Sequence, residues 1–465
     1  MDKNKLLVYF AILLMGLSIT FFSAKAQFDP RNVGFLVFLV VFIPTLLKPD
    51  IGLVIIIVSM LFSPELVVGS TSAREVTIRI EDVFLIVVVL AVFIRTTLTK
   101  DITKIFKTKL TAPFFLYFAA CVFSTLLASM SADIDLKHSF FTILKYVEYF
   151  LLFLMVKDNM RSLGQAKIFM AIFLLVALMV AVHAQRYIAQ QHTAGVTYFR
   201  VGPPIPKVGG SEPGTLGGYL LFMMAIAAGL LVYMRPIYIR AFLVVLLLLL
   251  FRSFLYTLSR GSYLAFIPML FSLVLFSKRF NLMYMVIAVF LLAVAFMPMM
   301  VRNRITETVT VKQTMEGASV EWEDSPRARL DSWKTVLFQR LPQSPIIGYG
   351  VGRYFIDSQI FLTLCESGLL GLVLLLRALF RLFKMAKETL NEVLLKGDNF
   401  SKGLSVGFMV GFIGLLVQSL STNTFIIIII MESFWFMAAM VFSLPQLLEK
   451  EEAIMQPPQT AASAA

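Results

Sequence analysis

The sequence is poor in charge, cysteine and histidine. Only 15% of its 465 residues are charged, whereas a soluble domain carries roughly 25%. Its two cysteines, Cys121 and Cys365, both lie in apolar runs, so the sequence predicts neither a disulfide nor a metal knuckle. Three histidines with no His-Glu-x-x-His or Cys-x-x-Cys pattern give little support for a metal site. No Gly-Lys-Ser/Thr follows a glycine cluster, which argues against a Walker loop, and we expect no cofactor.

Long apolar runs dominate the sequence instead. Hydrophobic residues make up 59% of the chain, and the mean hydropathy is +0.85. Runs that can cross a bilayer as helices, about 20 residues each with their flanks, recur from one end to the other. They are too long and too continuous for the alternating strands of a membrane barrel. The sequence therefore predicts an all-α polytopic integral membrane protein with about 12–14 transmembrane helices.

The expected helices follow one another closely. Their apolar cores run over residues 6–22, 33–47, 51–62, 83–94, 112–130, 140–156, 168–183, 216–234, 239–256, 262–276, 282–300, 360–376, 404–420 and 425–444. The second to fourth cores are short, and one of them is compatible with a re-entrant segment. The first core, after Lys3 and Lys5 and before Ala24-Lys25-Ala26, resembles a cleavable signal peptide; we favour an uncleaved first helix.

Basic residues indicate the orientation of these helices. The formal net charge is +13, which in a soluble protein would suggest nucleic acid. Here the basic residues concentrate in alternate short loops, as the positive-inside rule requires, and we expect no nucleic-acid partner. With the N-terminus taken as cytoplasmic, the loops around Lys157, Arg235 and Arg377 face the cytoplasm. Both termini then lie inside, and two long loops face outward.

These two loops suggest how the chain is organised. We expect an N-terminal transmembrane bundle over residues 1–183, a first outward loop over 184–213, central transmembrane helices over 214–300, a large outward loop over 301–356, C-terminal transmembrane helices over 357–444 and a disordered cytoplasmic tail over 445–465. The large loop carries charges of both signs and is compatible with a short helix over 330–340. Long loops among closely spaced helices are more often functional than merely connecting.

Arginines near the outward boundary are candidates for anion binding. Arg200 lies in the first loop, and Arg260 lies in a very short turn between two helices. A guanidinium offers a fixed fork of donors that suits a phosphate or pyrophosphate. The structural alternative is that both side chains only extend towards lipid headgroups. We favour function for Arg260, because an arginine in such a turn needs a polar partner. Arg252 sits deeper in its helix, and we expect it near the outer end in an internal pair.

Carboxylates beside or within the apolar runs are further candidates. Asp357, at the membrane mouth, fits a general base or, alternatively, a helix N-cap. Glu366 lies inside an apolar run, where a carboxylate suggests function, although neighbouring serines offer it a structural role. Lys145 and Glu148 are three residues apart, and we favour an i,i+3 ion pair over a proton relay.

Several stretches together resemble the O-antigen ligase and O-antigen polymerase superfamily. The first is Arg200 leading into Ser211-Glu212-Pro213-Gly214-Thr215-Leu216-Gly217-Gly218-Tyr219-Leu220, and the second is Thr257-Leu258-Ser259-Arg260-Gly261. The third is Arg329-Leu330-Asp331-Ser332-Trp333 followed by Ser344-Pro345-Ile346-Ile347-Gly348-Tyr349-Gly350. Each stretch alone is a weak signal. Their order, their spacing and their common outward location carry the resemblance, which covers roughly residues 145–376.

The resemblance implies a GT-C-like membrane glycosyltransferase of the inverting, metal-independent type in the bacterial cytoplasmic membrane. Its donor would be a glycan on undecaprenyl pyrophosphate, its active site would face the periplasm, and its partners would include membrane lipid, a chain-length regulator and a flippase. By this likeness Arg200 and Arg260 would bind the pyrophosphate, and Asp357 would be the base. Further substrate contacts are expected from Arg252, Glu212, Arg327, Arg329, Trp333, Tyr349 and Glu366.

One departure from the family pattern bears on the activity. Ligases of the superfamily typically carry a His-Asn pair where the last long loop meets its helix, and Asp357-Ser358 occupy that place here. We therefore favour a polymerase of repeat units for O-antigen, capsule or exopolysaccharide, with the ligase as the alternative. Rivals of other classes are a lipid-linked oligosaccharide flippase, although the paired broken helices of a transporter are not evident, and a non-catalytic assembly subunit.

Overall fold

The structure is a computed structural model of the chain. It describes residues 41–42, 44–45, 48–63, 65–70, 75–99, 107–131, 134–205, 212–295, 297–306, 309–314, 317–322 and 324–455. The expected helix over 6–22 and most of the one over 33–47 lie outside the described residues, as does the end of the predicted tail after residue 455.

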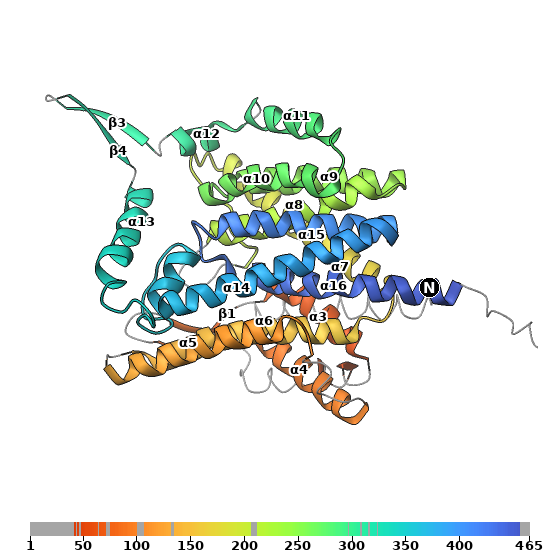
Figure 1. Ribbon diagram of the computed structural model, residues 1–465. Coiled ribbons are helices and arrows are strands. Elements are labelled where there is room, and N and C mark those ends of the chain that lie inside the picture. The colour runs from red at the N-terminus through yellow and green to blue at the C-terminus, as the bar shows by residue number, and fades with distance from the viewer. Residues whose placement is uncertain are drawn as a thin grey trace, which may run out of the picture.

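The described part of the chain is a bundle of helices (Figure 1). They are α3 (Pro49–Phe62), α4 (Ile80–Thr99), α5 (Thr111–Ser131), α6 (Leu136–Asn159), α7 (Leu163–Thr193), α8 (Pro213–Tyr233), α9 (Ile237–Leu255), α10 (Arg260–Ser277), α11 (Leu282–Ala295), α12 (Met299–Thr306), α13 (Asp324–Thr335), α14 (Gln359–Lys396), α15 (Asn399–Gln418) and α16 (Ile428–Met455). Nine of these described helices are long and apolar enough to cross a membrane. The predicted fold class, an all-α polytopic membrane protein, is confirmed.

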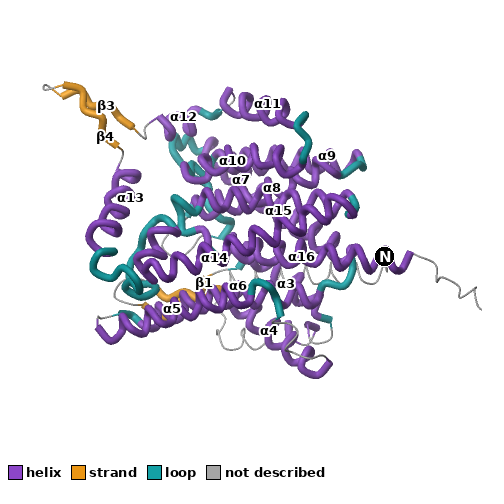
Figure 2. The backbone as a smooth tube through the Cα atoms, viewed as in Figure 1, coloured by secondary structure: helices purple, strands orange, loops and turns teal. Residues whose placement is uncertain are grey.

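Two small β-hairpins that the sequence did not lead us to expect accompany the helices. β1 (Glu65–Ser70) pairs antiparallel with β2 (Glu75–Arg79), and β3 (Val309–Thr314) pairs antiparallel with β4 (Gly317–Trp322). Both hairpins are rich in β-branched residues, which favour strands. The β3–β4 hairpin stands away from the bundle above α13 (Figure 2). Each hairpin is a separate ribbon, so the bundle itself remains helical.

The centre of the bundle is formed by α8, α15 and α16, most of whose residues are buried. Small residues allow the backbones of α8 and α15 to approach closely, as is common between membrane helices. A Cβ atom on Gly229 would collide with the backbone of Gly407, and one on Gly403 would lie 2.8 Å from the Cα of Leu230. Aromatic side chains such as Phe408 and Phe434, whose ring centroids are 5.2 Å apart, fill the space beside this contact.

Three of the differences between the observed and the expected helix bounds change the expected organisation of the chain. α7 continues to Thr193, so the first loop begins later than residue 184. The helix expected over 282–300 is divided into α11 and α12; Pro298 stands at the division, where its missing N–H and its ring oppose a continuous helix. α16 passes through Pro445 and ends at Met455, so the start of the segment expected to be disordered is helical. Leu447 and Leu448 are buried there and anchor the extra turns.

α14 is interrupted inside the bundle, and a loop fills the interruption. Gly368 has a φ of 64° and a ψ of −163°, which no helix contains. Backbone hydrogen bonds of 2.9–3.1 Å join the two sides of this joint: Tyr349 N–H to Cys365 O, Gly350 N–H to Glu366 O, Leu369 N–H to Pro345 O and Leu370 N–H to Ile346 O. The loop thereby provides hydrogen-bond partners for the backbone N–H and C=O groups that the break leaves without helical partners. Irregular backbone is tolerated at membrane depth only where such groups are satisfied.

Candidate substrate-binding and active site

Four arginines from separate segments converge at one end of the bundle. Arg200 lies in the loop after α7, Arg260 begins α10, Arg304 lies in the last turn of α12, and Arg329 lies in α13. The Nε of Arg260 donates to the carbonyl of Arg304 at 3.1 Å. The Nε of Arg200 donates to the carbonyl of Thr257 at 3.4 Å, in the turn just before Arg260. The two arginines predicted from the sequence, Arg200 and Arg260, are therefore brought together.

The cluster concentrates positive charge in a partly buried place. Burial lowers the pKa of Arg200, and the like charges of Arg304 and Arg329 lower it further, while Tyr198 opposes them. The positive charges of Arg200, Arg304 and Arg329 also act on Arg260. Arginine stays protonated despite such a lowered pKa. The positive electrostatic potentials of the four side chains therefore add together within the cluster. An anion placed there would be favoured by all of them.

The beginnings of α8, α10 and α14 lie beside the arginines. Gln418, at the end of α15, connects the first two: its Nε2 donates to the carbonyl of Gly214 and to the Oγ of Ser262, each at 3.1 Å. The next residue, Ser419, accepts the N–H of Gln359, where α14 begins, at 2.9 Å. A helix N-terminus carries a partial positive charge, and it therefore favours anions. The three helix ends reinforce the arginine field.

Glycines in the sequence motifs make this convergence possible. A Cβ on Gly217 of α8 would collide with the Oγ of Ser262, and a Cβ on Gly261 would collide with the Oγ of Ser421. The turn between α9 and α10 also places Leu258 at a φ of 50°, in the left-handed region. The Glu-Pro-Gly-Thr-Leu-Gly and Thr-Leu-Ser-Arg-Gly motifs thus pack against each other beside Arg260.

Asp357 stands at the mouth of the site and is paired with Arg329. Its Oδ2 lies 3.2 Å from the Nε of Arg329, and both side chains are 35% exposed. The indole Nε1 of Trp333 donates to the carbonyl of Asp357 at 3.0 Å, and its ring stacks on Phe361 with centroids 4.9 Å apart. The N-cap residue of α14 is Ser358, so Asp357 is not the N-cap considered as its structural alternative. The carboxylate is accessible and held in one place.

Arg329 and Trp333 reach Asp357 together because they are four residues apart on α13, and residues at that spacing share one face of a helix. Arg327, on the same helix, is exposed and forms no side-chain hydrogen bond or ion pair with the described residues. Two of the three predicted contact residues from this stretch therefore lie at the site, whereas Arg327 does not join them.

Glu366 and Tyr349 lie in the joint between the loop and α14. The Oε1 of Glu366 accepts the N–H of Gly352 at 2.8 Å, and the side chain is only 4% exposed. The hydroxyl of Tyr349 donates to the carbonyl of Arg340 at 3.0 Å. Both side chains are engaged in holding the loop, and no contact with the arginine cluster is found among the described residues. Their substrate-binding role stays a prediction.

Arg252, Glu212 and Lys145 are the remaining residues that the sequence singled out. Arg252 is exposed on the last turn of α9 and makes no side-chain hydrogen bond or ion pair within the described chain, so the expected internal pair is absent. Glu212 precedes α8 and accepts the hydroxyl of Thr215 at 2.9 Å; the preceding Ser211 is outside the described residues. Lys145 has no ion pair among the side chains that the structure describes, so the predicted pair with Glu148 is not formed.

Two residues of the site were missed in the sequence. Arg304 belongs to no motif and lies at the end of a helix that was expected to be continuous. Gln418 is fully buried at the end of a long apolar run, and an amide in that position was a usable signal. A buried amide must find hydrogen-bond partners, and here it joins two helix ends.

Comparison with known proteins agrees with this geometry. Residues 245–376 match the family model described as O-Antigen ligase. The matched segment contains Arg260, Arg304, Arg329, Asp357 and the interrupted part of α14, but it stops short of Arg200 on the N-terminal side. No curated protein matches the chain. The fold and site define a multi-pass membrane protein with an arginine-lined site. The match confirms the resemblance to the O-antigen ligase and polymerase superfamily, and it supports a membrane enzyme of O-antigen or polysaccharide assembly.

Proposed function

We propose that this protein is a membrane glycosyltransferase that polymerises undecaprenyl-pyrophosphate-linked repeat units into O-antigen, capsule or exopolysaccharide. The single observation that supports it most is the convergence of Arg200, Arg260, Arg304 and Arg329 with three helix beginnings, beside the accessible carboxylate of Asp357. The proposal includes the bacterial inner membrane, cytoplasmic termini and a site that faces the periplasm, where a flippase and a chain-length regulator would meet it.

In this proposal the arginines bind the pyrophosphate of the donor. When the bond between the anomeric carbon and the pyrophosphate oxygen breaks, the leaving group gains negative charge. Cations and helix N-termini gathered around the leaving group stabilise the transition state more than the ground state. Arg200 and Arg260 are held by backbone carbonyls at 3.4 and 3.1 Å, so little reorganisation is needed when the charge develops.

Asp357 is the proposed general base. The acceptor sugar hydroxyl attacks the anomeric carbon from the face opposite the pyrophosphate, which inverts that carbon, and its proton passes to the Asp357 carboxylate. Arg329 holds this carboxylate before substrate binds. An incoming pyrophosphate competes with Asp357 for Arg329, and this competition would free the carboxylate for the acceptor only when the donor is present.

The polymerase is favoured over the ligase because Asp357-Ser358 stand where ligases of the superfamily carry a His-Asn pair. The ligase remains the second candidate, because the matching family model is described as O-antigen ligase. The two activities use the same donor and differ in the acceptor. A test must therefore offer both acceptors to the same preparation.

The test is turnover by the purified full-length protein in detergent. It receives an undecaprenyl-pyrophosphate-linked repeat unit, with or without lipid A core, and the products are separated on a gel. We expect a ladder of polymer without lipid A core. Arg260→Ala should lower the rate about 100- to 1,000-fold, as loss of one transition-state donor does. Arg252→Ala, which removes an arginine from the same end of the same helical hairpin but outside the cluster, should keep the ladder.

The outcomes separate the proposals. Product that forms only when lipid A core is added would identify the ligase. Equal loss of the ladder in the Arg260 and Arg252 variants would mean that general damage, and not the cluster, explains the effect. Absence of any product with authentic donor and both acceptors, from protein that melts cooperatively, would contradict a glycosyltransferase.

A further inference from the structure

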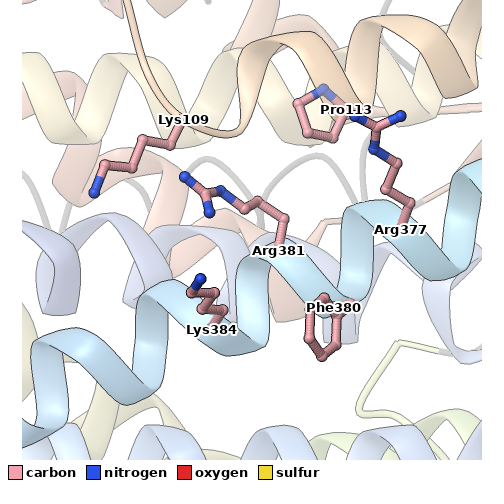
Figure 3. A pocket seen from close by; sticks show the side chains of 6 residues that line it. All are labelled: Lys109, Pro113, Arg377, Phe380, Arg381 and Lys384. Atoms are coloured by element: carbon pink, nitrogen blue, oxygen red, sulfur yellow. The ribbon is translucent and has the colours of Figure 1, made fainter.

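A cationic pocket lies between α5 and α14, away from the arginine cluster. It has a volume of about 390 Å³ and is lined by Lys109, Pro113, Arg377, Phe380, Arg381 and Lys384. Arg377 and Arg381 extend from α14 towards Pro113 and Lys109 at the beginning of α5 (Figure 3). Four basic side chains thus surround one cavity whose other walls are apolar.

The pocket lies at the opposite end of α5 from the joint that leads to Asp357. Gly350, in that joint, lies against Thr125 and Ala128 of α5, whereas Pro113 precedes Ala128 by about 15 residues, roughly 22 Å along this unbroken helix. That length is about three quarters of the thickness of the hydrocarbon core of a bilayer. The pocket therefore cannot hold the same pyrophosphate as Arg200 and Arg260, and it needs an explanation of its own.

The surroundings of the pocket suit a lipid better than a free anion. Leu369, Val373, Leu376 and Phe380 on α14 are exposed and spaced three or four residues apart, so they share one face of the helix with Arg377. Phe115, on the first turns of α5, is 68% exposed. An apolar surface at hydrocarbon depth thus leads directly to the cations, an arrangement that suits acyl chains and a headgroup in one molecule.

The charge balance at the pocket also favours an anion. Lys109 has an ion pair with Glu388 at 3.7 Å, in which both side chains are largely exposed. Arg377, Arg381 and Lys384 form no ion pair with the described residues of the chain. Basic residues gathered at one membrane boundary attract anionic headgroups, and basic pockets between transmembrane helices bind lipid phosphates.

We propose that this pocket binds the phosphate of an anionic glycerophospholipid, whose acyl chains lie along the exposed apolar face of α14 and α5. Arg377 and Arg381 donate to the phosphate oxygens, and Lys109 and Lys384 contribute charge from either side. The ligand is a resident membrane lipid, distinct from the sugar donor at the other boundary. The proposal does not depend on the proposed glycosyltransferase activity.

The experiment measures lipid binding by native mass spectrometry on the delipidated full-length protein in detergent. The protein is titrated with phosphatidylglycerol, with phosphatidylcholine and with inorganic phosphate. We expect tighter binding of phosphatidylglycerol and no competition by phosphate at comparable concentration. Each basic residue near an anionic lipid is worth roughly a five-fold change in affinity. The double variant Arg377→Gln/Arg381→Gln should therefore bind phosphatidylglycerol about 25-fold more weakly.

The matched control is Lys387→Gln/Lys396→Gln, which removes the same charge from the same helix outside the pocket and should change the affinity little. If both double variants bind phosphatidylglycerol equally weakly, the loss of affinity follows from net charge alone, and the proposal is overturned. Phosphatidylcholine binding as tight as phosphatidylglycerol, or competition by phosphate alone, would overturn it as well. If the arginine double variant fails to fold, Lys384→Gln alone should weaken binding about five-fold, and unchanged binding would refute the site.

Discussion

Replacing Gly348 by alanine should destabilise the protein through the joint between the loop and α14. Gly348 has a φ of +76°, where an L-residue costs about 1–2 kcal/mol. Its added Cβ would lie 2.6 Å from the backbone nitrogen of Gly368 and 2.7 Å from the carbonyl carbon of Glu366. Backbone atoms inside a packed bundle cannot rotate away as a side chain can, so the loop must move out.

Moving the loop weakens the hydrogen bonds that satisfy the broken helix. The joint has four backbone bonds between residues 345–350 and α14, and each contributes roughly 1 kcal/mol. If half of that is lost, the variant should be about 3–4 kcal/mol less stable, strain included. The loss is a large part of the stability of an ordinary protein, about 5–15 kcal/mol. Turnover should fall with it, because the loop leads to Asp357.

The assay is unfolding of the purified protein in detergent, compared with the Gly164→Ala variant. Gly164 lies in the first turn of α7, where a Cβ would meet only the Oγ of Ser162 at 3.8 Å and φ is not positive. That control should melt like the unchanged protein. If Gly348→Ala also melts like the unchanged protein, the joint does not hold the loop as the structure indicates, and its motif would need a different explanation.

Two further predictions concern single carboxylates. Asp357→Asn should lower the rate of glycosyl transfer about 100- to 10,000-fold while leaving donor binding nearly intact, because it removes the base and leaves the arginines; a parallel loss of donor affinity in a binding assay would contradict the assigned role. Burial raises the pKa of Asp398, but hydrogen bonds from Ser401 and the 3.0 Å pair with Lys167 outweigh it, so this pKa lies below its ordinary value. The stabilisation is present above the unfolded pKa of roughly 3.9 and is lost as pH falls through the folded pKa. Asp398→Asn should therefore melt earlier than the unchanged protein at pH 7 but not at low pH, and an equal difference at both would refute the linkage.

Hydropathy alone was enough to place most helices. Every expected core from 51–62 onwards that falls in the described chain contains a helix, because the bilayer requires each apolar run to satisfy its own backbone. The interruption at Pro298 carried a visible signal, since proline opposes a continuous helix. The continuation of α16 past Pro445 did not, because it depends on Leu447 and Leu448 finding a buried place in the tertiary structure.

The sequence could indicate candidate site residues only by their residue type and by their expected depth in the membrane. Arg200, Arg260 and Asp357 were singled out because ionised groups at a membrane boundary need a reason to be there. Arg252 satisfied the same criterion, yet its side chain is exposed and forms no hydrogen bond or ion pair with the described residues. Hydropathy cannot separate these cases, because it reports depth along a helix and not the direction that a side chain faces.

By itself, then, the sequence determined the class of protein, the succession of helices and the residues that must sit near a membrane surface, since all three follow from the solvation of individual segments. Which of those residues meet was decided only by tertiary structure. Arg200, Arg260 and Arg329 belong to segments far apart in the chain. The carbonyl of Thr257 holds Arg200 beside the turn that carries Arg260, and Asp357 holds Arg329. Glu366 shows the same division: its burial was readable in advance, but its task of holding Gly352 arises from a loop that folds back across the break in α14.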